Sequence, residues 1–170
     1  MRLKSLVIVM LFLLSTYSFA DFTAKVINIV DGDTIDILDD NNHKLRIRLL
    51  GIDAPELKQN FGYDSFSYLN KILFGKSVMI ISRPEKNKPY TLGYYKRVIG
   101  KVVMNGRDIN LEMIKKGIAW HFKKYKKSQP IDERHSYNKA ENYARDKNIG
   151  LWSEENPLPP WEWRKLNRKR

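Results

Sequence analysis

The amino-acid sequence predicts an α+β fold, a small five-stranded β-barrel with about three packed α-helices. Five segments between residues 22 and 104 have the β-branched or alternating apolar pattern of strands. One segment after the third strand, and two after the fifth, carry apolar residues at helical spacing. At 170 residues the chain is long enough for one domain with its own core.

The first twenty residues are expected to lie outside this domain. Arg2 and Lys4 precede an uninterrupted apolar run, LVIVMLFLL (6–14), and TYSFA (16–20) ends in small residues. This pattern is typical of a secretory signal peptide cleaved after Ala20. The alternative, a membrane anchor, needs ~20 apolar residues, about twice the length of this run. We therefore expect an exported protein, secreted or periplasmic, with no stable membrane association after cleavage.

Three strands are expected in succession, at 22–30, 34–38 and 44–52. The last two are separated by DDNNH (39–43), a cluster of turn-forming residues, so the three strands predict an antiparallel meander. A fourth strand is expected at 76–82 and a fifth at 95–104, which closes on the turn Asn105-Gly106.

A helix is expected at 64–74, between the third and fourth strands, and Gly75 suits its end. A second helix follows the predicted N-cap Asp108, and a third begins at Asp132. The apolar face of the third helix is expected to comprise Tyr137, Ala140, Tyr143 and Ala144. Five strands, one inserted helix and helices at the end predict a barrel of the OB type. The domain is assigned to residues 21–163, followed by a basic tail at 164–170.

The charge of the chain favours polyanionic partners. The formal net charge is +12, and removal of Arg2 and Lys4 with the signal peptide leaves +10. Such a surplus attracts nucleic acid, anionic lipid or acidic polysaccharide, and does not choose among them. The chain contains no cysteine, so the domain folds without disulfides.

Two acidic segments are candidate sites. VDGDT (30–34) has the Asp-Gly pair of a hairpin turn, which is its simplest interpretation. It is not an EF-hand, since Ile35 and Asp36 stand where that loop needs an acid or amide and then glycine. In RIRLLGIDAPE (46–56), Pro55 ends strand pairing, so Asp53 and Glu56 leave the strand at a bend.

A barrel would bring the two acidic segments together. Asp33 and Asp53 would then offer the hard carboxylate oxygens that Ca²⁺ prefers, and Glu56 would orient or deprotonate a water. Arg48 would bind a phosphoryl group through its planar fork. The alternative is a surface ion pair between Arg48 and Glu56, worth ~0–1 kcal/mol. A second arginine, Arg97 in GYYKRVIG, is either a further phosphate ligand or a solvent-facing strand residue.

Together these motifs resemble the thermonuclease (staphylococcal nuclease-like) family. The likeness includes VDGDT, RLLGIDAPE at a fixed interval, a Y-x-R on a later strand, GIAWHFKKY (117–125) and the ending IGLWSEENPLPPWEW (149–163). The resemblance implies an OB-fold barrel that hydrolyses phosphodiester bonds of DNA and RNA with Ca²⁺ and leaves 3′-phosphates. A monomer is the default expectation.

The resemblance also implies roles for individual residues. Asp33 and Asp53 look like metal carboxylates, and Ala54 sits where the family offers a backbone carbonyl to the metal, so that its side chain is expected to matter little. Glu56 looks like the general base, and Arg48 and Arg97 like the pair that binds the scissile phosphate. Tyr95 and Tyr125 are expected to contact the substrate, whereas Asp31 and Thr34 would orient the metal ligands.

Two departures from the family pattern concern the surroundings of these residues. Gly93-Tyr94-Tyr95-Lys96-Arg97 replaces Asp-Lys-Tyr-Gly-Arg, and the segment after Glu56 is short. The alternative functions are a nucleic-acid-binding platform without activity, and a basic protein that binds anionic lipid or glycan. The first would be expected to lack an acid or an arginine that this chain retains, and the second leaves the acidic residues unused.

Overall fold

The computed structural model describes residues 20–84, 90, 92, 93 and 97–168, and it describes no side chain for Ala20, Tyr125 or Lys126. The predicted signal peptide, apart from Ala20, lies outside the described residues. Within the described part of the chain, no helix combines the length and apolar character needed to cross a membrane.

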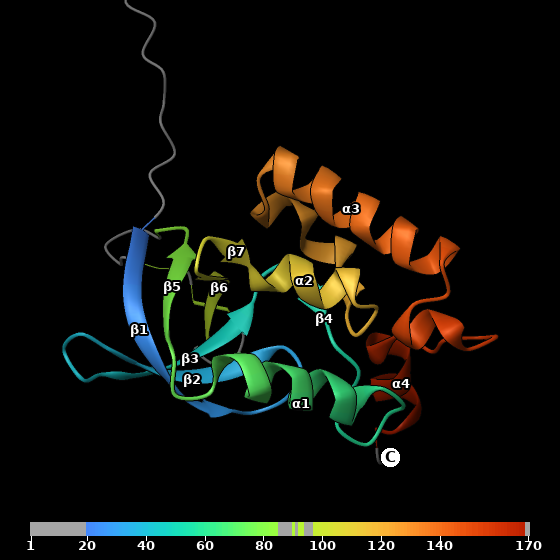
Figure 1. Ribbon diagram of the computed structural model, residues 1–170, viewed down its shortest axis with the longest axis horizontal. Helices are drawn as coiled ribbons and strands as arrows, with labels where there is room; N and C mark the ends of the chain where they lie inside the picture. Colours follow the sequence, from blue (N-terminus) through green and yellow to red (C-terminus); the bar gives the residue numbers. More distant parts are fainter. Residues whose placement is uncertain (1–19, 85–89, 91, 94–96, 169–170) are drawn as a thin grey trace, which may run out of the picture.

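Five strands form a closed barrel (Figure 1), which confirms the predicted OB-type fold. Its strands are β1 (Ala20–Ile29), β2 (Thr34–Asp39), β3 (Lys44–Leu49), β5 (Ser77–Ser82) and β6 (Val98–Met104). β1 pairs antiparallel with β2 and β5, β2 with β3, and β5 with β6. A parallel pairing of β3 with β6 closes the barrel, and the short β7 (Arg107–Asp108) pairs antiparallel with the end of β6.

The long first strand takes part in both halves of the barrel. Its first half pairs with β5 and its second half with β2, and the register shifts between Val26 and Asn28. Such a bulge increases the local twist and bends the strand, which a small barrel needs in order to close. The predicted meander of β1, β2 and β3 is confirmed.

Alternation on β2 and β3 separates the core from the outer surface. Ile35, Ile37, Ile47 and Leu49 are at most 1% exposed and lie within the barrel core. The residues between them on β3, Arg46 and Arg48, therefore lie on the outer face, as period-two geometry requires. The register of this hairpin thus fixes which face carries the arginines.

The predicted strand 44–52 is interrupted. The chain turns after Leu49 at Gly51, whose φ of 76° lies in the left-handed region, and whose missing Cβ leaves room for the side chain of Gln129. It then forms β4 (Ile52–Asp53), which pairs with β8 (Trp120–His121) in a separate two-stranded sheet. The bend therefore precedes Asp53, rather than following it at Pro55.

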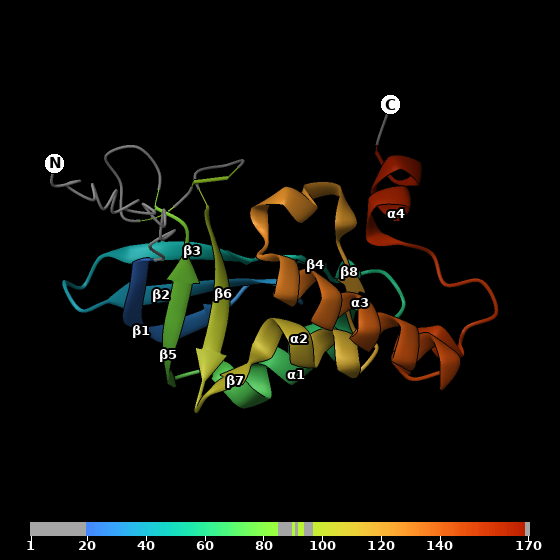
Figure 2. The ribbon, with the colours of Figure 1, turned by 90° about the horizontal axis from the view of Figure 1, so that it is seen from above.

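The described residues form four α-helices, one more than predicted. They are α1 (Gly62–Leu73), α2 (Ile109–Lys115), α3 (Ile131–Asp146) and α4 (Pro160–Leu166), with 3-10 helices η2 (Lys123–Ser128) and η3 (Gly150–Ser153). Figure 2 shows α4 at one end of the molecule and the turn that joins β2 to β3 at the opposite end. The boundary drawn at residue 163, between domain and basic tail, falls inside α4.

The helix starts agree with the sequence at α2 and differ at α3. Asp108 caps α2, since its carboxylate accepts a hydrogen bond from the Leu111 amide. α3 begins at Ile131, after Pro130, and has no side-chain cap. Its first residue thus comes one residue before the predicted start at Asp132. Its buried face includes Glu141 in place of Tyr143, which is 56% exposed.

A second apolar cluster joins the C-terminal segment to the barrel. It contains Trp120, Ala144, Leu151 and Trp152, against which Trp161 of α4 packs. The rings of Trp120 and Trp152 lie edge to face at 4.3 Å between centroids. This cluster therefore fixes α4 next to β8, the partner strand of β4.

Candidate active site

The turn formed by VDGDT lies directly against the segment that contains Asp53. A Cβ on Gly32 would lie 2.5 Å from the Cβ of Ser65 on α1 and 2.7 Å from the Cβ of Ala54. Only glycine permits this approach, and Ala54 must also be small. The methyl group of Ala54 therefore has a role in packing, whereas the predicted metal contact concerns its backbone carbonyl. The two acidic motifs, predicted to meet if the chain formed a barrel, do meet.

Asp33 is buried and held from several sides. Its Oδ2 accepts a hydrogen bond from the Ala54 amide at 2.9 Å, and its Oδ1 accepts one from the Thr34 hydroxyl at 3.0 Å. Its own amide donates to Oδ1 of Asp31 at 2.9 Å. The turn thus presents one carboxylate in a fixed orientation toward the end of β3.

Arg48 lies between the two predicted metal ligands. Its Nη2 is 2.9 Å from Oδ2 of Asp33 and 2.8 Å from Oδ1 of Asp53. Its Nη1 donates to the carbonyl oxygens of Leu49 and Ile52, both at 2.8 Å. Because two carboxylates converge on one nitrogen, Asp33 and Asp53 are close neighbours. We call Asp33, Asp53 and Glu56, with the arginines that contact them, the acidic cluster.

A second guanidinium reaches the acidic cluster from α4. Arg164 contacts Oδ2 of Asp53 at 2.7 Å through Nη2 and Oε1 of Glu56 at 2.6 Å through Nη1. The alternative pairing of Arg48 with Glu56 is thus not what the structure shows, since the partner of Glu56 is Arg164. Sequence reasoning missed Arg164. The available signal was PPWEWR, in which Pro160 starts a helix and Trp161 and Arg164 share a face.

Burial and the repulsion between neighbouring carboxylates raise the pKa values of two aspartates at this site. Burial, and then the charge of Asp33, raise the pKa of Asp31 to about 6. Burial also raises the pKa of Asp53, against the opposing effects of Arg164 and Arg48. Both shifts mean that ionisation of these carboxyl groups is less favourable than in water, and positive charge nearby, from a guanidinium or a metal cation, favours the ionised form.

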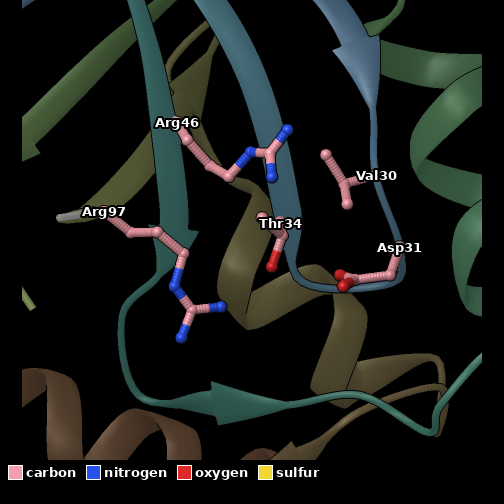
Figure 3. A pocket seen from close by; sticks show the side chains of 5 residues that line it. All are labelled: Val30, Asp31, Thr34, Arg46 and Arg97. Atoms are coloured by element: carbon pink, nitrogen blue, oxygen red, sulfur yellow. The ribbon is translucent and has the colours of Figure 1, made fainter. Parts of the chain in front are cut away.

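Arg97 lies beside the acidic cluster and lines an open hollow with Val30, Asp31, Thr34 and Arg46. The parallel register pairs Ile47 with Val98, so Arg97 lies next to Arg46 on the outer face of the barrel. Figure 3 shows both guanidinium groups and the Asp31 carboxylate at this hollow. Arg97 and Arg48 therefore belong to the same outer face of neighbouring strands.

Two predicted substrate ligands are not described. Tyr95 lies outside the described residues, and Tyr125 belongs to η2 with its side chain outside them. Both assignments stay predictions.

The donor chemistry of the acidic cluster suits calcium. Asp33 and Asp53 provide hard carboxylate oxygens that already converge on one point. In the described part of the chain, no group of three or more His, Cys, Asp or Glu side chains is arranged so that it could hold a metal ion by itself. A bound Ca²⁺ would therefore need backbone carbonyl oxygen and water besides the two carboxylates.

Comparison with known proteins gives consistent matches. A family model described as staphylococcal nuclease homologue matches residues 46–154. An uncharacterized endonuclease of Haemophilus influenzae is 37% identical over 155 residues, which cover 91% of this chain and 80% of that protein. Micrococcal nuclease of Shigella flexneri is 33% identical, over 98% of this chain and 94% of its own length. A staphylococcal-like nuclease of Arabidopsis thaliana is 41% identical over 74% of this chain but only 35% of its own length.

Proposed function

Since the chain belongs to the staphylococcal nuclease family, we propose that it is an exported, Ca²⁺-dependent nuclease that cleaves DNA and RNA and leaves 3′-phosphates. It is a hydrolase that acts on phosphodiester bonds, in common with relatives named as nucleases. The observation that carries the finer proposal is the convergence of Asp33 and Asp53, from two separate motifs, on Arg48.

The residues divide the work by their chemistry. Asp33 and Asp53, with the Ala54 carbonyl, would hold Ca²⁺, which supplies positive charge to the phosphate and to the attacking water. Glu56, whose side chain is 35% exposed, accepts a proton from that water as its oxygen attacks phosphorus. The bond from phosphorus to the 5′-oxygen breaks, and that oxygen leaves with the bonding electrons and takes up a proton from solvent to become a 5′-hydroxyl, so the phosphate stays on the 3′-oxygen.

The arginines neutralise the charge that grows on the phosphate oxygens during attack. Arg48 would exchange its carboxylate contacts for phosphate contacts when a cation binds Asp33 and Asp53, while Leu49 and Ile52 carbonyls hold its other nitrogen. Arg97 approaches the same phosphate from the neighbouring strand. Tyr95 and Tyr125 would contact the remainder of the nucleotide, and the positive net charge attracts the polyanion.

The test uses residues 21–170 with circular plasmid and with single-stranded RNA, in calcium and in excess EGTA. We expect cleavage of both substrates in calcium only. The products should carry 5′-hydroxyl ends that polynucleotide kinase labels without prior phosphatase treatment, and 3′ ends that can be ligated only after a phosphatase removes the 3′-phosphate. Unchanged cleavage in EGTA would contradict the metal requirement. Binding in calcium without cleavage would instead indicate a nucleic-acid platform. Export is tested separately by the N-terminal sequence of the protein recovered outside the cytoplasm, which should begin at Asp21.

A further inference from the structure

We propose that Arg164, on the C-terminal helix α4, is a positioning residue for the hydrolysis, because it holds the side chain of Glu56 beside Asp53. This inference rests on the proposed function, in which Glu56 accepts the proton of the attacking water. It adds Arg164 to the two arginines already assigned to the site, Arg48 and Arg97. Arg164 lies 108 positions along the chain from Glu56.

The contact has the geometry of a bridge between two carboxylates. Nη1 of Arg164 donates to Oε1 of Glu56 at 2.6 Å, and Nη2 donates to Oδ2 of Asp53 at 2.7 Å. Asp53 itself is 1% exposed, whereas Glu56 is 35% exposed and stands at the edge of the acidic cluster. One planar guanidinium thus ties a partly solvated carboxylate to a buried, immobile one.

Only one oxygen of Glu56 is engaged in this way. Among the described side chains, Oε1 has a charged partner in Arg164, and no ion pair or hydrogen bond involves Oε2. A glutamate side chain has three rotatable bonds, so an untethered Glu56 would sample many positions. With Oε1 held, Oε2 is kept at the cluster, where it can accept a proton from a water.

The position of α4 follows from its own sequence. Trp161 and Arg164 are three residues apart and therefore share one face of the helix. The Trp161 ring packs edge to face against Trp120, at 5.5 Å between centroids. Trp120 of β8 is the direct strand partner of Asp53 of β4. Once Trp161 is anchored on Trp120, Arg164 is therefore delivered to Asp53.

A second link connects the same two segments through Gln59. Its side-chain oxygen accepts the Glu56 amide at 3.2 Å, and its side-chain nitrogen donates to the Leu158 carbonyl at 2.5 Å. The C-terminal segment is therefore linked to Glu56 in two ways: indirectly to its backbone amide through Gln59, and directly to its side chain through Arg164. Two independent links to one residue indicate that its placement is what the C-terminal segment provides.

The experiment compares Arg164→Ala and Arg164→Lys with Lys165→Ala in the chain 21–170. Lys165 is the next residue of α4, pairs only with Glu162 among the described residues and is 63% exposed, so its loss removes the same charge without touching the cluster. In calcium, with an oligonucleotide substrate, we expect Arg164→Ala to lower kcat about 10- to 100-fold and to change KM less than about threefold. Arg164→Lys should give an intermediate kcat because one ammonium cannot bridge both carboxylates in a plane.

A double-mutant cycle separates positioning from general stability. If Arg164 acts through Glu56, then Arg164→Ala should lower kcat no further in a Glu56→Gln background. A purely structural role would lower kcat by the same factor in both backgrounds. Amide hydrogen exchange in EGTA gives a readout without turnover: Arg164→Ala should exchange faster at α4 and residues 56–60 and unchanged in the barrel.

The outcomes are distinct. Equal kcat for Arg164→Ala and Lys165→Ala, or a higher kcat for Arg164→Ala, overturns the inference and leaves the proposed function intact. Additive effects in the cycle also overturn it. If Arg164→Ala does not fold, Arg164→Lys decides alone, since a wild-type kcat would contradict a bridging role. Absence of cleavage by the unmodified chain in calcium would refute the proposed function itself.

Discussion

The acidic cluster has two halves that are built differently. The near half comes from the VDGDT turn and the β3–β4 segment, whose acids Asp33 and Asp53 are twenty positions apart in the chain. The remote half is Arg164, which arrives on a seven-residue helix at the C-terminal end. Both halves meet at Asp53, which contacts Arg48 on one side and Arg164 on the other.

The two halves also differ in how firmly they are held. The near half depends on strand register and on a contact between Gly32 and Ala54 that leaves no room for a Cβ. The remote half depends on Trp161, which is only partly buried, and on side-chain hydrogen bonds. Tight backbone packing resists displacement, whereas a short helix with a partly exposed anchor opens locally at lower cost. The near half therefore determines whether the site forms, and the remote half determines how precisely the Glu56 side chain is positioned.

The strongest way to break the near half is Gly32→Ala. The added Cβ would overlap with Ser65 and Ala54, so the turn must move away from β4 and carry Asp33 with it. Overpacking of this kind typically costs about 1–3 kcal/mol. We expect a lower urea midpoint together with loss of nearly all cleavage.

The double variant Gly32→Ala with Ala54→Gly provides the control. It removes one of the two overlaps, at 2.7 Å, while the overlap with Ser65 remains. We expect part of the stability and activity to return. Wild-type cleavage by the single variant would show that the approach of the turn to Ala54 is not needed for the site.

Within the near half, Arg48→Lys tests chemistry instead of packing. The guanidinium contacts two carbonyls and two carboxylates at once, which one ammonium cannot match. We expect the fold and most nucleic-acid binding in EGTA to persist while kcat falls about 100-fold, by comparison with the loss of a transition-state donor in other enzymes. The measurements are kcat in calcium and a binding titration.

Arg107→Lys is the matched control, because Arg107 is exposed and pairs with Glu112 away from the acidic cluster. It should leave kcat unchanged. Near-normal turnover in Arg48→Lys would mean that Arg48 does not stabilise the transition state.

The remote half is tested by Trp161→Ala. Loss of its contacts with Trp120 and Phe122 should free α4 from β8 and leave the barrel folded. The cost should be below the roughly 3–5 kcal/mol typical of a fully buried tryptophan, since this one is partly exposed. We expect about a tenfold drop in kcat and faster amide exchange at α4 only. Loss of the whole fold would show instead that the two halves are one cooperative unit.

The same contrast explains what the sequence could predict. The meander and the meeting of Asp33 with Asp53 follow from alternation, turn residues and barrel closure, all of which are local or topological. Arg164 could not be placed, because α4 is too short for a clear periodicity and its position depends on a ring contact with Trp120.

Two smaller errors have the same kind of cause. The apolar pattern of Leu50 and Ile52 suggested a continuous strand, whereas Gly51 turns it by adopting a positive φ. Glu141 takes the buried position on α3 expected for Tyr143, because Lys123 and the His121 amide satisfy its carboxylate. In both cases a partner distant in sequence decides the outcome, and periodicity carries no information about it.

The smallest expected effect concerns Asp36 and Arg46, which lie on the β2–β3 hairpin beside the near half but outside the acidic cluster. A hydrogen bond from Arg46 is the main cause that holds the pKa of Asp36 below its usual value, against the effect of burial. The folded state then binds this proton more weakly than the unfolded state, so the pair stabilises the fold above about pH 4 and ceases to do so as the pH falls below it. Since Arg46 is half exposed, the contribution at pH 7 is about 1 kcal/mol or less. Urea midpoints from pH 2 to 7 for the wild type and Arg46→Gln should therefore differ at neutral pH and converge in acid; a constant difference would show that Arg46 stabilises the hairpin through packing and not through the charge of Asp36.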